Sequence, residues 1–165
     1  MQLATQRRKK ISKRGLELIK FFEGLELTAY LCPAKVPTIG YGHTGSDVTR
    51  DDVDKKTITE KEAERLLKQD LRVFEDAVNR NVKVPLNQNE FDALVSWTYN
   101  LGETNLINST MLDELNEGKY ELVPSEMMKW VKAGKPKKTL KGLVNRRRAE
   151  GLLFMGKDWR DFKDE

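Results

Sequence analysis

The feature that most constrains the fold is a long amphipathic segment in the middle of the chain. Thr59 and Glu62 have the spacing of a capping box, in which each side chain pairs with a backbone N–H of the first helical turn. Apolar residues then recur at helical spacing: Ala63, Leu66, Leu67, Phe74 and Val78. The pattern predicts a helix over about 60–79, whose apolar stripe must pack against neighbouring elements.

Helical periodicity also dominates most of the remaining sequence. A segment over about 12–23 ends at Gly24, because glycine is typical of helix C-termini. Asn87 and Glu90 predict another capped helix, which Gly102 ends. Further helices are expected over 110–117, 120–132 and 140–155, with residues 133–138 as a loop.

One stretch breaks the helical pattern. Polar and apolar residues alternate on both sides of a connection bracketed by Pro33 and Pro37. This predicts a β-hairpin in which Cys32 shares a face with Tyr30 and Thr38 lies just across the turn. A small β-element within a mainly helical chain indicates the α+β fold class.

Length and composition indicate one compact domain without covalent cross-links. The chain has 165 residues with one cysteine and one histidine, which excludes an internal disulfide and argues against a structural zinc site. No apolar run reaches the roughly 20 residues of a membrane span. The basic N-terminus has no apolar stretch of the signal-peptide type, so we expect production in a reducing cytosol.

Charge is unevenly distributed, although the net charge is only +4. Residues 1–20 carry a net charge of +6, residues 21–128 carry −9, and residues 129–148 contain nine bases and no acid. Two basic segments around an acidic middle suggest a polyanionic partner. The alternative is that much of this charge is a solvated helix face, since a charge run alone identifies no partner.

The most informative residues lie at the end of the first helix and in the hairpin. Glu23 is followed after eight residues by Cys32 and after five more by Thr38, which begins the run Thr-Ile-Gly-Tyr-Gly-His. Two further segments, 99–104 and 145–148, follow in order. Together these residues resemble the phage-type lysozymes (endolysins) of the T4-like lysozyme family, whose pattern is Glu, eight residues, Asp, five residues, Thr. The resemblance covers nearly the whole chain.

This resemblance implies a lysozyme-like α+β fold in three parts. We expect a small lobe with the hairpin over 12–58, a connecting helix over 59–80 and a helical lobe over 81–165. It also implies cleavage of a glycosidic bond. That reaction needs an acid that protonates the leaving oxygen and a second group that activates water or stabilises the oxocarbenium-like centre. By resemblance, Glu23 is the general acid and Thr38 holds the attacking water, and we expect no metal and no organic cofactor.

Cys32 stands where the family usually has Asp, although some similar phage lysozymes carry Cys. A thiol with an ordinary pKa is only a few per cent thiolate at neutral pH, but that fraction is very nucleophilic. Three interpretations stay open. Cys32 acts as base or nucleophile, or it is passive while Glu23 and Thr38 do most of the work, or it marks an impaired site. Oxidation of the thiol is a further hypothesis, tested by the dependence of the rate on reductant.

The remaining candidates come with structural alternatives. Asn100 stands where the family has an amide that lines the sugar-binding surface, and an ordinary cap or core amide is the alternative. Arg146 matches the arginine that pairs with the catalytic Glu, so we count it with the substrate-binding residues. His43 is expected to pair with a nearby Asp rather than to act in catalysis. The acids after the hairpin are interpreted as turn and cap residues: Asp47, Asp51 and Asp52.

Two functions of different classes follow. By resemblance, the chain is an endolysin, a muramidase that hydrolyses the β-1,4 bond between N-acetylmuramic acid and N-acetylglucosamine in peptidoglycan and lyses the host. It is then expected to be a monomer, to bind no nucleic acid, and to accumulate in the host cytoplasm until a holin releases it to the wall. The alternative is a non-enzymatic cationic protein that binds an anionic envelope or nucleic acid. A combined version has residues 129–148 bring the enzyme to an anionic outer-membrane surface.

Overall fold

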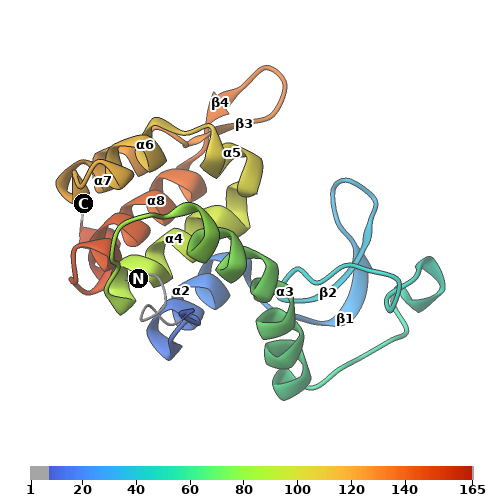
Figure 1. Cartoon of the computed structure of the whole chain (residues 1–165). Coiled ribbons are helices and arrows are strands. Elements are labelled where there is room, and N and C mark those ends of the chain that lie inside the picture. Colours follow the sequence, from blue (N-terminus) through green and yellow to red (C-terminus); the bar gives the residue numbers. More distant parts are fainter. Residues whose placement is uncertain (1–7, 165) are drawn as a thin grey trace. The chain divides into compact units, whose positions relative to one another are not determined.

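The computed structural model describes residues 8–164, and its elements are mainly helical (Figure 1). The α-helices are α2 (Lys13–Glu23), α3 (Glu60–Asn81), α4 (Gln88–Leu101), α5 (Glu103–Ile107), α6 (Thr110–Asn116), α7 (Val123–Met127) and α8 (Lys141–Phe154). The strands are β1 (Glu26–Leu31), β2 (Pro37–Gly40), β3 (Lys132–Ala133) and β4 (Lys138–Thr139). Short 3-10 helices are η1 (Arg50–Asp52), η2 (Tyr120–Leu122) and η3 (Trp159–Asp164). The predicted α+β class is confirmed.

The chain divides into two compact units. One comprises Ile19–Arg72, and the other comprises the described residues up to Leu18 together with those from Val73 onward. Helices α2 and α3 contribute residues to both units. The division into a small lobe, a connecting helix and a helical lobe at residues 58 and 80 stays a prediction. No helix among residues 8–164 combines the length and the apolar character that a membrane crossing requires.

The unit Ile19–Arg72 is built around the antiparallel hairpin β1–β2. Tyr30 pairs directly with Thr38, which lies just across the turn as predicted, and the register is irregular between Glu26 and Tyr30. The core of this unit is small and uses apolar side chains from the hairpin, the following loop and α3: Ala29, Ile39, Val48 and Leu66, with Ile58 packed against them. This core fixes the hairpin on α3 and so positions the residues of its turn.

The other unit is a set of packed helices with α4 buried among them. The side chain of Asn87 accepts from the Glu90 N–H at 2.8 Å, and the Glu90 carboxylate accepts from the Asn87 N–H at 2.9 Å. The predicted capping box therefore starts α4, and Gly102, with a φ of +93°, ends it as predicted. All residues of α4 from Phe91 to Thr98 are buried. Helix α8 packs against α4, α7 and η3.

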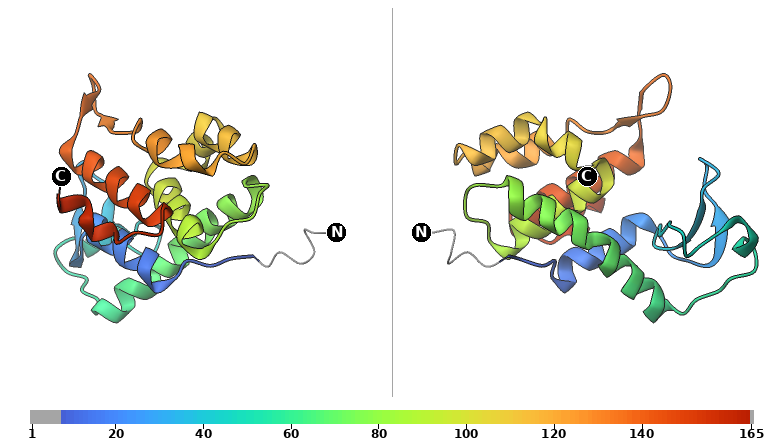
Figure 2. Two further views of the ribbon diagram at one scale, coloured as in Figure 1. Left: turned by 90° about the vertical axis from the view of Figure 1, so that its left-hand side faces the viewer. Right: turned by 45° about the vertical axis from the view of Figure 1, so that its right-hand side comes forward.

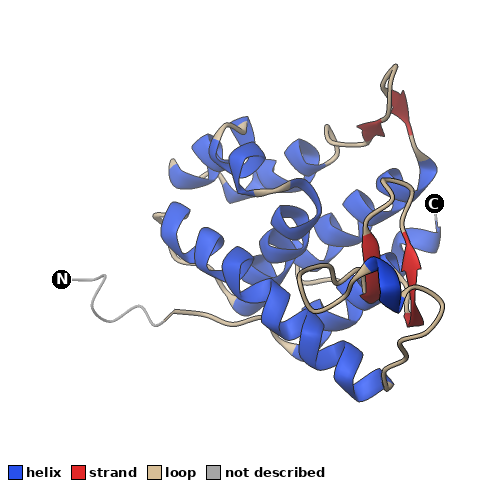
Figure 3. Ribbon diagram, turned by 90° about the vertical axis from the view of Figure 1, so that its right-hand side faces the viewer, coloured by secondary structure: helices blue, strands red, loops and turns tan. Residues whose placement is uncertain are grey.

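The expected helix over 120–132 is wrong. The segment forms η2 and then α7, which ends at Met127, and Lys132 already belongs to strand β3. The expected loop over 133–138 is instead largely the turn of a second hairpin, β3–β4, which extends beyond the helices of its own unit (Figure 2). Figure 3 shows the strands of both hairpins in red. Apolar residues just before β3 have helix-like spacing, and two-residue strands are too short to show alternation.

Candidate functional site

Glu23 is the last residue of α2 and is half-buried. Gly24 follows with a φ of +77° and donates its N–H to the Lys20 carbonyl at 3.0 Å, so a glycine ends the helix as predicted. Gly42 lies beside the carboxyl of Glu23. A Cβ atom at position 42 would stand 3.4 Å from Glu23 Oε1, and the φ of +88° there also favours glycine. The segment after β2 therefore passes close to the carboxyl without crowding it.

Cys32 is a half-exposed free thiol in the turn that joins β1 to β2. Its N–H donates to the Val36 carbonyl at 3.1 Å, and its carbonyl accepts from the Lys35 N–H at 2.7 Å. The pKa of Cys32 is lowered, mainly because the backbone N–H of Val36 stabilises the thiolate. The N–H of Ala34 and the hydroxyl of Thr38 act in the same direction, and together these groups outweigh the opposite effect of burial. The turn therefore favours the reactive, ionised form of the thiol.

Thr38 is buried on β2, with 3% of its surface exposed. Its hydroxyl donates to the Val36 carbonyl at 2.8 Å. The hydroxyl has one proton, which it gives either to this carbonyl or to the Cys32 thiolate, and in both states its lone pairs remain to accept a hydrogen bond from a further group. A water molecule with an O–H to donate meets that requirement.

Tyr30 shows that the carboxyl and the thiol act on a common environment. Burial raises the pKa of Tyr30, and the negative charges of Glu26, Cys32 and Glu23 raise it further. The charges of Cys32 and Glu23 therefore both act on this phenol. The unit Ile19–Arg72 thus brings together the three residues predicted to be catalytic, with Thr38 on the strand opposite Tyr30.

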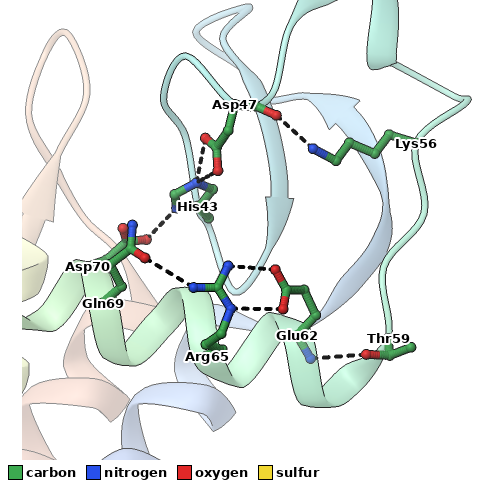
Figure 4. Close-up of polar contacts among 8 residues, drawn as sticks. All are labelled: His43, Asp47, Lys56, Thr59, Glu62, Arg65, Gln69 and Asp70. Atoms are coloured by element: carbon green, nitrogen blue, oxygen red, sulfur yellow. Dashed lines mark hydrogen bonds and ion pairs between the residues drawn. The ribbon is translucent and has the colours of Figure 1, made fainter.

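His43 lies between two carboxylates, and its ring is almost completely buried (Figure 4). Nδ1 is 2.8 Å from Asp70 Oδ2, and Nε2 is 2.9 Å and 3.0 Å from the two carboxylate oxygens of Asp47. The structural pairing predicted for His43 is confirmed. The interpretation of Asp47 as a turn or cap residue is incomplete, because its carboxylate pairs with His43. Among residues 8–164, no three His, Cys, Asp or Glu side chains gather as metal ligands would.

The two residues predicted to bind substrate lie in the other unit. Asn100 is exposed in the last turn of α4, and its Oδ1 accepts a hydrogen bond from Nη2 of Arg147. Arg146, on α8, is buried. Its Nε is 3.1 Å from Glu150 Oε2, and its Nη2 is 3.3 Å from Ser96 Oγ. Both candidates are therefore held by buried polar side chains of α4 and α8.

Sequence reasoning missed two of these residues, Arg147 and Glu150, which are fully buried. Arg147 Nε is 3.1 Å from Glu150 Oε1. Burial lowers the pKa of Arg147, and the neighbouring Arg146 lowers it further, whereas the charge of Glu150 raises it. The available signal was spacing, because residues 146 and 147 lie four and three positions before 150 and so share its helix face.

Comparisons with known proteins agree with the motifs. The family described as phage lysozyme matches residues 20–150. The endolysin of Bacillus phage PZA is 47% identical over 146 residues, which are 87% of this chain and 54% of that protein. The chain therefore spans about half the length of this relative and of the endolysin of Bacillus phage B103.

Solved structures give the same result. The endolysin from Escherichia coli O157:H7 phage FAHEc1 superposes with a TM-score of 0.83 at 44% identity, over 91% of this chain and 96% of that chain. The muramidase domain of SpmX from Asticaccaulis excentricus gives a TM-score of 0.82 at 40% identity, over 90% of this chain and 99% of that chain. The likeness extends over nearly all of the described residues.

Proposed function

Because the chain belongs to the phage lysozyme family and has a lysozyme-like fold, we propose that it is a muramidase of the endolysin type. Its substrate is the β-1,4 bond between N-acetylmuramic acid and N-acetylglucosamine in bacterial peptidoglycan, and its action lyses the host cell. The muramidase name of one close structural neighbour supports this substrate. The observation that carries the proposal is the placement of a carboxyl, an acidified thiol and an accepting hydroxyl in one unit, at Glu23, Cys32 and Thr38.

The proposed reaction divides the work among these three groups. Glu23 gives its proton to the glycosidic oxygen while the bond from the anomeric carbon to that oxygen breaks. Cys32 supplies the second group as a thiolate, which either attacks the anomeric carbon or removes a proton from water. Thr38 accepts a hydrogen bond from that water, which leaves a water lone pair directed to the carbon. Asn100 and Arg146 are proposed to bind the glycan.

Turbidity loss of Gram-negative cells stripped of their outer membrane tests the activity. Glu23→Gln removes the acid proton, so we expect the rate to fall about 10²–10⁴-fold. Glu26→Gln is the matched control, because it makes the same change at an exposed position on β1 and should clear the cells at the wild-type rate. Equal clearing by Glu23→Gln and wild type would refute the muramidase and favour the non-enzymatic cationic protein.

The role of Cys32 has its own test. Cys32→Ala should lower the rate about 10²-fold or more, and Cys32→Asp, which installs the residue usual in the family, should restore most of it. The anomeric configuration of the first product, followed by NMR, then assigns the role. Retention indicates attack by the sulfur and inversion indicates a base acting on water. Full activity of Cys32→Ala would show that the thiol is passive.

We also propose that the hairpin β3–β4 brings the enzyme to an anionic outer-membrane surface. The buried Arg146 and Arg147 have no part in this surface, so the basic segment 129–148 is reduced to its lysines and the half-buried Arg148. Five lysines on or next to the hairpin are exposed: Lys132, Lys135, Lys137, Lys138 and Lys141. A lysine near an anionic membrane surface contributes about 1 kcal/mol of attraction. Of the predicted basic segment 1–20, residues 1–7 lie outside the described residues.

Binding to lipopolysaccharide-containing vesicles tests this surface. The triple variant Lys135→Gln, Lys137→Gln, Lys138→Gln should lose most of the binding seen at low salt, because screening and charge removal act on the same attraction. The control variant Lys55→Gln, Lys61→Gln, Lys157→Gln has the same net charge and changes exposed lysines elsewhere. Equal losses in both variants would refute a localised surface.

The proposed protein acts as a monomer, binds no nucleic acid and passes from the host cytoplasm to the wall through a holin. Sedimentation at micromolar concentration and a DNA mobility-shift assay test the first two statements. For release, the protein is expressed with and without a holin. Lysis is expected only with the holin, and rapid lysis without it would refute this route.

A further inference from the structure

Arg147 is a buried cation that the proposed reaction does not use. It projects from α8, its side chain has no exposed surface, and its Nη2 donates to the side-chain oxygen of Asn100 on α4. Asn100 itself is exposed. A buried, rigid donor thus contacts one half of an exposed amide.

The chemistry of the guanidinium fixes which half of the amide it contacts. Arginine has five N–H donors and no acceptor, so the atom of Asn100 that meets Arg147 must be the carbonyl oxygen Oδ1 and not the NH₂ group. The NH₂ group is then the half of Asn100 that remains available to a ligand. Arg147 thus fixes the orientation of the amide, occupying one lone pair of Oδ1 and leaving both N–H donors of the NH₂ group for a ligand.

Glu150 holds Arg147 in this position. Its carboxylate lies 3.1 Å from Arg147 Nε through one oxygen and 3.1 Å from Arg146 Nε through the other, and Ser96 Oγ donates to the second oxygen at 2.5 Å. Glu150 is fully buried, so water cannot replace these partners. One carboxylate therefore forms an ion pair with both arginines, although the contact between Arg147 Nε and Glu150 Oε1 lacks hydrogen-bond geometry, and through Arg147 it acts on Asn100.

We propose that Asn100 is a dedicated hydrogen-bond donor to the carbonyl oxygen of a sugar N-acetyl group, and that Arg147 and Glu150 are positioning residues that hold it in this orientation. The inference rests on the proposed function, because the ligand is the N-acetylated glycan of that reaction. A hydroxyl can pair with either half of an amide, so a fixed amide gains selectivity only toward a group that solely accepts. The N-acetyl carbonyl is such a group.

Asn100→Asp tests the donor role without removing the contact to Arg147. A carboxylate still accepts from the guanidinium, so the fold should be as stable as wild type or more so, but the NH₂ donors are lost. On soluble peptidoglycan strands we expect KM to rise about tenfold with little change in kcat. The matched control is Asn89→Asp, also on α4, where Oδ1 accepts from Arg14 Nη1 at 3.2 Å and the same change should leave KM unaltered.

A change in the substrate gives a second test of the donor role. De-N-acetylated strands carry an ammonium group, a donor, in place of the carbonyl. Wild type should prefer N-acetylated strands about tenfold, and Asn100→Asp should lose or reverse that preference. Arg147→Lys, which keeps the charge but loses the planar fork, should raise KM and weaken the same preference with kcat retained. A merely structural role of Arg147 would change the melting temperature alone.

The outcomes separate the two proposals. If wild type cleaves the strands and Asn100→Asp keeps its KM and its preference, the donor role is refuted while the muramidase stands. If wild type cleaves no strands, the proposal that the protein is a muramidase is refuted. Binding of N-acetylglucosamine oligomers, followed by the side-chain NH₂ signals of Asn100 in NMR, then decides the donor role, and unmoved signals would refute it.

Discussion

A cluster of charged side chains in one unit of the molecule contrasts with a cluster in the other, because one is open to water and the other is buried. In Ile19–Arg72, His43 lies between Asp47 and Asp70, whose side chains are 54% and 25% exposed. In the other unit, Arg146, Arg147 and Glu150 are 5%, 0% and 0% exposed. The first cluster contains a group that changes charge between pH 5 and 8, whereas arginine stays charged throughout.

The difference predicts how each cluster responds when a partner is lost. Around His43, water can reach the carboxylates and replace a missing partner. Around Glu150 it cannot, so removal of one partner leaves an uncompensated buried charge. The buried cluster should therefore be intolerant of substitution at any pH, and the exposed one should be tolerant and sensitive to pH.

Glu150→Gln should have the largest effect. It removes the carboxylate that forms an ion pair with both Arg146 and Arg147, so we expect the free energy of unfolding to fall by about 3–5 kcal/mol in urea denaturation. Glu103→Gln is the control, since it breaks an ion pair with Arg80 at 2.5 Å that is 29% and 58% exposed. That change should cost about 1 kcal/mol or less. Equal losses would contradict the contrast between buried and exposed clusters.

His43→Asn should have a smaller effect that depends on pH. Burial alone would lower the pKa of His43, but its hydrogen bonds to Asp70 and Asp47 outweigh this and raise it. The stabilisation is therefore complete below the ordinary histidine pKa of about 6.5 and is lost as pH rises through the raised value. The hydrogen bond from His43 lowers the pKa of Asp47, so that contribution is present above about pH 3.9 and is lost as pH falls.

The stabilisation by His43 is lost at high pH and that by Asp47 is lost in acid. The cluster therefore stabilises the fold most between about pH 4 and 6.5. We expect His43→Asn to lose about 1–3 kcal/mol of unfolding free energy at pH 5.5 and clearly less at pH 9. Urea denaturation at the two pH values measures this difference. A loss that grows with pH would show that the ring acts by packing and not by its charge.

Much of the fold could be predicted from the sequence because its helices begin and end at strong local signals. Gly24 and Gly102 end their helices at positive φ, and the capping box of Asn87 and Glu90 has the expected hydrogen bonds. The expected helix over 120–132 failed because its apolar spacing continues past the point where the chain leaves α7. Residues 128–131 leave the helix before β3 begins, and no glycine or proline marks that point in the sequence.

Some residues of the candidate site could likewise be predicted from the sequence, and others could not. Glu23, Cys32 and Thr38 could be identified because the family spacing runs along a short, continuous piece of chain. Arg147 and Glu150 were missed because charged residues on a helix are usually solvated, and only burial by other helices makes them positioning residues. The lowered pKa of Cys32 depends on the backbone N–H of Val36, a property of the folded turn and not of residue types.

The smallest expected effect compares the two carboxylates of the exposed cluster. Asp47→Asn changes a side chain that is 54% exposed, and the new amide oxygen can still accept from His43 Nε2–H, so we expect a loss below about 1 kcal/mol. The main-chain carbonyl of Asp47, which accepts from Lys56 Nζ at 2.7 Å, is unaffected. Asp70→Asn changes the carboxylate that is only 25% exposed, so it should cost more unfolding free energy than Asp47→Asn. It should also lower the pKa of His43 by more than Asp47→Asn does.

NMR titration of His43, the only histidine in the chain, measures both pKa changes without ambiguity of assignment. The order of the two variants is the decisive result. If Asp47→Asn lowers the pKa and the stability as much as Asp70→Asn, exposure does not set the strength of a partner in this cluster. The two clusters would then differ in the ability of their groups to titrate, and not in access of water to the charges.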